Sequence, residues 1–212
     1  MPSIDFKIYL IGDRTQTSGR PLSQVIREAG RAGIRAIQFR EKDLPLRAQL
    51  QLASEIRSVA KQQRMQFFVN DRIDLCLALD AEGIHLPSSG LPVAVAREML
   101  GGSKRIGVSC HSLEEVQRAE FEGADFAVLG PIYETPSKRP YGPPLGIDLF
   151  RKVRRSTAIP LFAIGGVDRL RLKELFEAGA DGVAMISAIL SSSDVYQASQ
   201  ALIEEMDRLH WI

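Results

Sequence analysis

The sequence predicts an α/β protein that folds as one (β/α)8 barrel over residues 1–212. Short apolar segments rich in β-forming residues alternate with longer segments of helical periodicity along the whole chain. Eight such units follow one another in 212 residues without a linker or a low-complexity break. This length and alternation are typical of a closed parallel barrel.

The predicted strands are short and nearly continuous in apolar residues, as expected for strands that helices cover. Their first residues are Lys7 (KIYLIG), Ala36 (AIQFR), Gln66 (QFFVN), Gly83 (GIHLP), Arg105 (RIGVSC), Phe126 (FAVLGP), Pro160 (PLFAIGGV) and Gly182 (GVAMIS). Three similar stretches, EAGRAGIRAI, FEGADFAVL and EAGADGVAM, each end a helix, turn at glycine and enter a strand. This repetition supports units of one strand and one helix.

Amphipathic segments lie between these strands. Residues 44–63 place five apolar side chains on one helical stripe: Leu46, Leu50, Ala53, Ile56 and Ala60. Residues 171–179 show the same periodicity and end on Gly179, a typical helix stop. Ser112 followed by Glu115 forms a capping box, which predicts a helix start directly after the fifth strand.

An open, doubly wound sheet is the structural alternative. That fold usually binds phosphate after its first strand, but residues 12–20 (GDRTQTSGR) lack the GxGxxG spacing. By contrast, residues 163–167 (AIGGV) and 185–189 (MISAI) end the last two predicted strands. Barrels commonly bind phosphate there through backbone N–H groups. These features favour the barrel and predict a phosphate site.

The composition is that of an ordinary folded protein, with 45% hydrophobic and 25% charged residues and a net charge of +1. This charge balance predicts no nucleic-acid partner and no anionic membrane surface as partner. No apolar run reaches the length of a membrane-spanning helix, and the first residues lack the features of a signal peptide. Cys76 and Cys110 are too few for a disulfide scaffold. We therefore expect a cytoplasmic protein.

Positively charged side chains follow two of the predicted strands. Arg40 and Lys42 come after the second strand, and Lys138 lies in the loop after the sixth. Three cations at one end of a barrel suit a diphosphate, because each charge-assisted hydrogen bond contributes about 1.5–3 kcal/mol. The alternative is that Arg40 and Lys42 are solvated charges at a strand exit.

Asn70 and Asp71 follow the third predicted strand. The carboxylate of Asp71 suits Mg²⁺, and the amide of Asn70 suits a phosphate or a ring substituent. Alternatively, both residues cap a helix that begins at Arg72.

Hydroxyl groups and glycines complete the candidate site. Thr135 and Ser137, beside Lys138, are either a phosphate pocket or ordinary turn residues. Gly165 and Gly166 end the seventh strand, where a backbone anion site is favoured over plain turn glycines.

The three histidines carry less information. His85 lies among apolar neighbours within a strand, which indicates a structural role. His111 either connects the fifth strand to its helix or acts as a general acid or base. His210 lies near the C-terminus and is expected to be exposed.

Seven motifs occur in a specific order and spacing: QFREK (38–42), VNDRIDL (69–75), GIHLP (83–87), IGVSCHS (106–112), GADFAVLGPIYETPSK (123–138), AIGGV (163–167) and GADGVAMISAI (179–189). In these motifs the chain resembles the thiamine phosphate synthase and TenI superfamily over nearly its whole length. The resemblance implies a TIM barrel, usually a homo-oligomer, that acts on small phosphorylated thiamine precursors. In the synthase branch, hydroxymethylpyrimidine diphosphate is coupled to hydroxyethylthiazole phosphate, and pyrophosphate is released with the help of Mg²⁺.

The resemblance also implies a role for individual residues. Those that match the diphosphate site are Arg40, Lys42, Asn70 and Lys138. Gln38 and Ser109 match residues that line the pyrimidine and reaction site, and Asp71 matches one Mg²⁺ ligand. Those that match the loop hydroxyls and the thiazole-phosphate end are Thr135, Ser137, Gly165, Gly166, Ile186 and Ser187.

Two departures leave the reaction open. Synthases follow the strand-four histidine with Gly-Gln-x-Asp, whose Asp is the second Mg²⁺ ligand, but this chain has Gly90 there. TenI, a thiazole tautomerase where characterised, shares the HLPSS and HSLEE stretches but uses a histidine where this chain has Pro131. We expect a synthase with Ser109, Lys138 and His111 as catalytic residues. The alternatives are a TenI-like tautomerase and a non-catalytic barrel that binds the phosphates of thiamine precursors.

Overall fold

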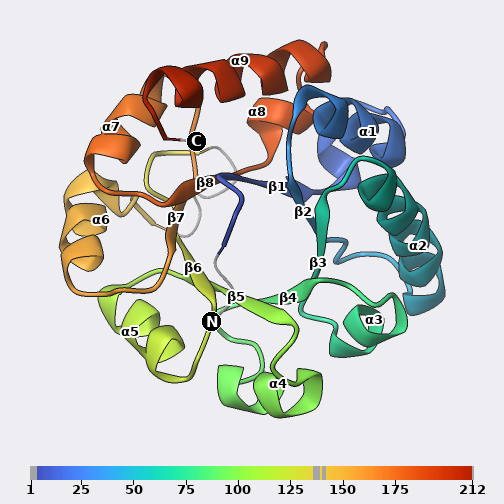
Figure 1. Ribbon diagram of the computed structural model, residues 1–212, viewed down its shortest axis with the longest axis horizontal. Helices are drawn as coiled ribbons and strands as arrows, with labels where there is room; N and C mark the ends of the chain where they lie inside the picture. The colour runs from blue at the N-terminus through green and yellow to red at the C-terminus, as the bar shows by residue number, and fades with distance from the viewer. Residues whose placement is uncertain (1–3, 136–138, 140–141, 212) are drawn as a thin grey trace.

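Eight parallel strands close into a barrel in the order β1 to β8, as the sequence predicts (Figure 1). The computed structural model describes residues 4–135, 139 and 142–211. The strands are β1 (Ile8–Gly12), β2 (Ala36–Phe39), β3 (Gln66–Asn70), β4 (Gly83–Leu86), β5 (Arg105–Cys110), β6 (Phe126–Leu129), β7 (Leu161–Ile164) and β8 (Gly182–Met185). The doubly wound alternative is wrong, because β1 pairs with both β2 and β8.

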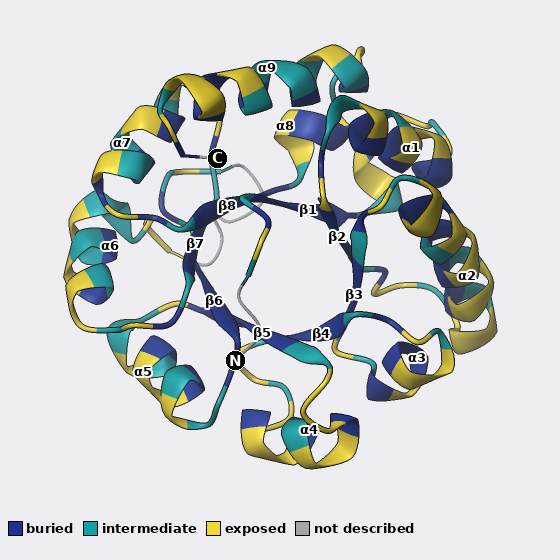
Figure 2. Ribbon diagram, viewed as in Figure 1, coloured by how far each residue is buried: buried dark blue, intermediate teal, exposed yellow. Residues whose placement is uncertain are grey.

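Helices form an outer ring around the barrel and turn their buried faces toward it (Figures 1 and 2). They are α1 (Leu22–Ala32), α2 (Leu46–Gln62), α3 (Ile73–Ala78), α4 (Val93–Leu100), α5 (Leu113–Phe121), α6 (Gly146–Arg155), α7 (Leu172–Glu177), α8 (Ser187–Leu190) and α9 (Val195–Arg208), with the 3-10 helices η1 (Arg14–Gln16) and η3 (Arg169–Arg171). Helix α9 packs against α1 and so joins the two ends of the ring. Within the described ranges, no helix is both long and apolar enough to cross a membrane.

Two predicted helix boundaries are confirmed. At the start of α5, Ser112 Oγ accepts the N–H of Glu115 at 3.2 Å. The Glu115 carboxylate accepts the N–H of His111 at 2.6 Å, one residue before the cap. At the end of α7, Gly179 has a φ of +83°, a left-handed conformation that favours glycine, and its N–H donates to Phe176.

The predicted apolar stripe of α2 is wrong at the start of the helix. Its last three members are buried, but Leu46 and Leu50 are 46% and 40% exposed. Gln49 is buried there instead, and its amide donates to the carbonyl of Leu44 at 2.8 Å. A polar side chain can take an inward position at little cost when a backbone group satisfies it. This bond therefore allows the first turns of α2 to present a different face to the barrel.

Aromatic rings fill the interior of the barrel. The rings are Phe6, Tyr9, Phe68, Phe126 and Phe162. Neighbouring centroids lie 5.3–5.8 Å apart in stacked, tilted and edge-on arrangements. The covering helices pack instead on the outer face of the sheet, in a separate cluster of mostly aliphatic side chains. These five rings, called the aromatic floor below, therefore form the bottom of any site inside the barrel.

Glycines make room for three of these rings. The in-register pairs on adjacent strands are Phe68–Gly83, Phe126–Gly107 and Phe162–Gly182. A Cβ added at Gly107 would lie 2.3 Å from Cζ of Phe126, closer than two carbon atoms can pack. The ring occupies the space that a side chain on the next strand would need.

An acidic residue directly before β4, β6 and β8 ties the strands to the helices. Each carboxylate accepts the N–H of Phe67, Ile106 or Leu161, at the start of the preceding strand, at 2.7–2.8 Å. Each also pairs with an arginine of α2, α4 or α6 at 2.5–2.8 Å, the pairs being Arg57–Glu82, Arg97–Asp125 and Arg154–Asp181. These Arg–acid clamps all lie at the N-terminal end of the strands.

The C-terminal segment folds back onto the ring of helices. Trp211, the only tryptophan of the chain, is 7% exposed. Its ring centroid lies 5.5 Å from that of Phe176 in α7. The segment after α9 is thereby attached to α7.

Candidate active site

The C-terminal ends of the strands carry the predicted site residues. Those that the structure describes are Gln38, Arg40, Lys42, Asn70, Asp71, Ser109, His111, Thr135, Gly165, Gly166, Ile186 and Ser187. Ser137 and Lys138 lie outside the described residues. Because all strands are parallel, these positions share one end of the barrel, opposite the Arg–acid clamps.

A group of polar side chains lies inside the barrel next to the aromatic floor. Nε2 of His85 is 2.9 Å from Oγ of Ser109, and the His85 ring centroid is 5.6 Å from that of Tyr9. Three buried atoms of this group have no hydrogen-bond partner among the described residues: the Tyr9 hydroxyl, Gln38 Nε2 and His85 Nδ1. A buried polar group without a partner costs about 1–3 kcal/mol. These atoms therefore mark a position for a polar ligand or for water.

The ionisable members of this group are uncharged near pH 7. Burial, together with the positive charge of Arg40, lowers the pKa of His85 to about 3. Burial also raises the pKa of Tyr9. A neutral imidazole has one donor and one acceptor nitrogen. The group thus suits an uncharged heteroaromatic ring that carries both donors and acceptors.

Charged residues directly follow β2, at the end of the barrel where the interior polar group lies. Nη1 of Arg40 lies 3.5 Å from the carboxylate of Asp13, and Lys42 is exposed. Glu41, between them in the chain, is buried and accepts the N–H of Arg14 at 2.8 Å. Glu41 therefore anchors the loop after β2 to the β1–α1 connection.

The interpretation of Asn70 and Asp71 as helix caps is wrong. The N-cap of α3 is Arg72, and no side chain caps this helix. Asp71 has a φ of +64° and an exposed side chain. A Cβ added at Gly90 would lie 3.2 Å from Oδ1 of Asp71. The position where the resemblance implies a second acidic ligand therefore faces the first.

The donors at this position fit Mg²⁺ only as part of a larger complex. Over the residues placed in the structure, no group of three His, Cys, Asp or Glu side chains is arranged to hold a metal ion. Mg²⁺ in phosphate-handling enzymes is commonly held by one or two carboxylates together with waters and substrate phosphates. Asp71 with Gly90 opposite therefore suits an ion that binds together with a diphosphate.

Backbone N–H groups gather after β7 and β8. Gly165 and Gly166 have φ values of +94° and +65°, which glycine adopts readily. The N–H groups of Gly166 and Val167, and those of Ser187 and Ala188 at the start of α8, have no partner within the described part of the chain. Such groups are available to an anion, as at other strand-to-helix turns.

The loop between β6 and α6 begins beside the end of β7. Ile132 N–H donates to Ile164 at 2.8 Å, and Tyr133 N–H donates to Gly165 at 3.0 Å. A hollow of ≈ 440 Å³ lies within this loop, and Thr135 is among its lining residues. Thr135 thus lies near the glycine turn of β7.

His111 is held at the end of β5. Its Nδ1 lies 2.6 Å from the carbonyl oxygen of Gly130 and must donate, because a carbonyl only accepts. This bond supports the connecting role and leaves Nε2 as the nitrogen available for proton transfer. His210 is exposed, as expected.

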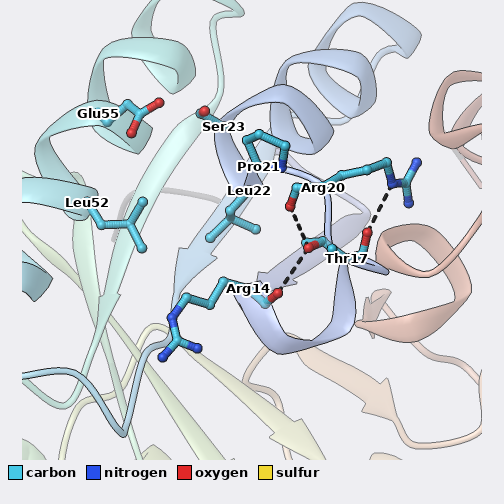
Figure 3. A pocket seen from close by; sticks show the side chains of 9 residues that line it. Arg14, Thr17, Arg20, Pro21, Leu22, Ser23, Leu52 and Glu55 are labelled. Carbon is cyan, nitrogen blue, oxygen red and sulfur yellow. Dashed lines mark hydrogen bonds between the residues drawn. The ribbon is translucent and has the colours of Figure 1, made fainter.

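A second hollow of ≈ 430 Å³ lies outside the barrel, between the β1–α1 loop and α2 (Figure 3). Leu22 and Leu52 line its middle, with Arg14 and Glu55 at opposite sides. The guanidinium of Arg20 is turned away from it and donates to carbonyl oxygens, including that of Leu190 at 2.8 Å. The predicted site residues do not line this hollow.

Sequence reasoning missed part of this site. It did not consider Tyr9 or Asp13, and it interpreted His85 as structural. A signal was present, because residues two apart in a strand face the same side. Gly83 pairs with Phe68, whose ring lies inside the barrel. His85 is two residues after Gly83 in the same strand, so it faces the interior as well.

Comparison with known proteins gives consistent matches. A profile of the thiamine monophosphate synthase family matches residues 8–189. A relative from Geobacter sulfurreducens is 45% identical over 96% of this chain and 95% of its own. A thiamine-phosphate synthase from Syntrophomonas wolfei is 36% identical over 98% of this chain and 100% of its own. The solved structure of thiamine phosphate pyrophosphorylase from Pyrococcus furiosus has a TM-score of 0.87 and 34% identity, covering 96% of both chains.

Proposed function

Since this chain belongs to the thiamine monophosphate synthase family, we propose that it is a thiamine-phosphate synthase. It couples hydroxymethylpyrimidine diphosphate to hydroxyethylthiazole phosphate. The bond between the pyrimidine methylene carbon and the diphosphate oxygen breaks, and pyrophosphate leaves. The thiazole nitrogen then forms a bond to that carbon. One observation carries the proposal. Three buried polar atoms without a hydrogen-bond partner among the described residues lie inside the barrel, and Arg40 and Lys42, here called the charged rim, follow β2 at the same end. At this end, too, backbone N–H groups without a partner among the described residues follow β7 and β8.

The pyrimidine ring binds at the interior group in this proposal. Gln38 Nε2 donates to a ring nitrogen, and the neutral His85 and Ser109 satisfy the remaining polar edge. The unpaired hydroxyl of Tyr9 lies beside the same position. Because these groups are uncharged, they orient the ring without opposing the positive charge that develops on its methylene carbon.

The diphosphate binds at the charged rim. Arg40, Lys42 and Asn70 donate hydrogen bonds to its oxygens and stabilise the charge on the departing pyrophosphate. Asp71 is the residue that would hold Mg²⁺ there, and the ion would neutralise part of the same charge. The phosphate of the second substrate binds the N–H groups that follow Gly165 and Ile186.

The compartment proposed for this reaction is the cytoplasm. Both cysteines of the chain, Cys76 and Cys110, are buried and unpaired. Free thiols are typical of proteins in a reducing compartment. Homo-oligomer formation remains a prediction.

The decisive assay combines the protein, both substrates and Mg²⁺, and follows the formation of thiamine phosphate by chromatography. Product formation well above the reaction without protein is expected. No product at high protein concentration would exclude the synthase. Incubation with the thiazole carboxylate tautomer alone then separates the remaining alternatives. Aromatisation faster than in buffer would indicate a tautomerase, and aromatisation at the buffer rate would leave a binding protein.

Arg40→Met tests the charged rim directly. We expect kcat/KM for the pyrimidine diphosphate to fall about 10- to 100-fold, because one charge-assisted hydrogen bond is lost. Arg47→Met, an exposed position in α2, is the matched control and keeps wild-type activity. Equal activity of the two variants would contradict the assignment of Arg40.

A further inference from the structure

We propose that Arg171 is a positioning residue that holds the Gly165–Gly166 turn in the conformation that binds phosphate. Arg171 ends η3, and it contacts both the turn after β7 and the start of the β6–α6 loop. This inference rests on the proposed function, because it takes the turn to be the phosphate end of the thiazole site. It concerns a residue that touches neither substrate.

Three contacts build the connection. A terminal nitrogen of Arg171, Nη1, donates to the carbonyl oxygen of Gly166. The guanidinium carbon lies 4.3 Å from the centroid of the Tyr133 ring, within the range of a cation–π interaction. The Tyr133 hydroxyl donates to Glu174 in α7 at 2.6 Å. Arg171 therefore joins the turn to a tyrosine that is itself fixed.

The direction of these bonds determines how the backbone N–H groups of Gly166 and Val167 are oriented. In a trans peptide unit the C=O and the N–H point in opposite directions. The carbonyl of Gly165 accepts the Tyr133 N–H at 3.0 Å, so the Gly166 N–H points away from Tyr133. The carbonyl of Gly166 accepts Arg171, so the Val167 N–H points away from the guanidinium. Among the described residues, neither of these two N–H groups donates to a backbone carbonyl.

The packing at Gly166 leaves the turn little freedom. A Cβ added there would lie 2.9 Å from Nη1 of Arg171 and 2.8 Å from Cβ of Tyr133. Arginine keeps its charge at any physiological pH. Burial and the adjacent Glu174 carboxylate raise the pKa of Tyr133, so its hydroxyl remains a donor. At neutral pH, therefore, Arg171 is charged and the Tyr133 hydroxyl is protonated, as these contacts require.

The test compares Arg171→Met with Arg169→Met. Arg169 belongs to the same short helix but pairs with Glu205 at 3.1 Å, and within the described residues its side chain forms no hydrogen bond or ion pair with the turn. In Arg171→Met we expect the KM for the thiazole phosphate to rise about tenfold, while the KM for the pyrimidine diphosphate stays within about twofold. Arg169→Met leaves both KM values near wild type.

Arg171→Lys is the second variant, and it also covers the case in which the methionine variant does not fold. It keeps a cation over Tyr133 but presents a point charge in place of the planar fork. We expect an intermediate rise in the same KM. A parallel rise in both KM values, or equal effects at positions 169 and 171, would overturn the inference.

A binding measurement separates this inference from the proposed reaction. Inorganic phosphate is titrated calorimetrically into wild type, Arg171→Met and Arg169→Met. We expect about tenfold weaker binding in Arg171→Met alone, whether or not the wild type forms thiamine phosphate. Equal phosphate affinity in all three proteins, or no binding to wild type, overturns the inference. An inactive wild type that shows the expected binding difference would overturn the reaction and leave the inference standing.

Discussion

In the proposed function, the Mg²⁺ position depends on two residues, Asp71 and Gly90. A side chain at position 90 would begin 3.2 Å from the Asp71 carboxylate, so a second acid there could share one cation with it. With glycine in that place, Asp71, water and substrate oxygens would have to coordinate the proposed Mg²⁺. Mg²⁺ is therefore expected to bind weakly until the diphosphate is present.

Replacing Gly90 by aspartate should strengthen the metal site. We expect Gly90→Asp to lower the Mg²⁺ concentration for half-maximal activity about tenfold, because a second carboxylate joins the first. The new Cβ would lie 2.9 Å from Cδ of Pro87, so a small shift is needed. Gly90→Asn is the control, since it has the same shape without the charge. An Mg²⁺ dependence equal to that of the control would contradict this account.

The buried His85 couples folding to pH. Its pKa is lowered from 6.5 to about 3 in the folded protein, so the unfolded chain binds a proton that the folded one excludes. The stability that the neutral ring contributes is present above pH 6.5 and is lost as pH falls toward 3. Between pH 7 and pH 5 this loss amounts to about 2 kcal/mol.

His85→Gln removes the titrating group and keeps a polar side chain of similar reach. Urea unfolding at pH 7 and pH 5 measures the effect. We expect wild type to lose about 2 kcal/mol more than the variant over this interval. Parallel losses in the two proteins would show that His85 is protonated at its ordinary pKa when folded.

On three pairs of neighbouring strands, an aromatic ring of one strand fills the space beside a glycine of the other. Gly107→Ala inserts a methyl group 2.3 Å from Phe126 Cζ, so either the ring or the backbone must move. We expect a loss of about 1–3 kcal/mol in the free energy of unfolding, typical of overpacking. Gly102→Ala, where nothing lies within 4 Å of the added Cβ, controls for the backbone entropy of glycine. Equal stability of the two variants would contradict this packing.

At the scale of elements, the sequence was most informative for strands and helix ends. Continuous apolar runs located every strand, because β1 to β8 are buried along most of their length. Ser112 and Gly179 marked helix ends through local chemistry that needs no tertiary partner. The face of α2 could not be predicted, because the bond from Gln49 to Leu44 that turns it depends on the loop conformation before the helix.

The candidate site was predictable where it follows strand ends. Arg40 and Asp71 could be assigned to it because a parallel barrel collects such positions on one side. Asp13 and Arg171 could not, because their roles come from contacts with Arg40 and Gly166 that lie in other loops. No local pattern in the chain indicates which loops meet.

In the whole molecule, the ion pairs that stabilise the fold and the residues of the candidate site lie at opposite ends of the barrel axis. The clamps Arg57–Glu82, Arg97–Asp125 and Arg154–Asp181 occupy one end, and the predicted site residues occupy the other, next to buried polar atoms that have no hydrogen-bond partner among the described residues. The aromatic floor lies between them. Satisfied ion pairs and hydrogen bonds at one end allow the other to keep unsatisfied groups for ligands without loss of the fold.

The contact between Trp211 and Phe176 gives the protein a built-in optical reporter. Phe176 lies in α7, the helix whose Glu174 accepts the hydroxyl of Tyr133, and Tyr133 packs beside the Gly165–Gly166 turn. Since the chain has no other tryptophan, its tryptophan emission arises from this one place. We expect ligands that bind at this turn to change the emission intensity, which a titration followed by tryptophan fluorescence would measure without a label and without turnover.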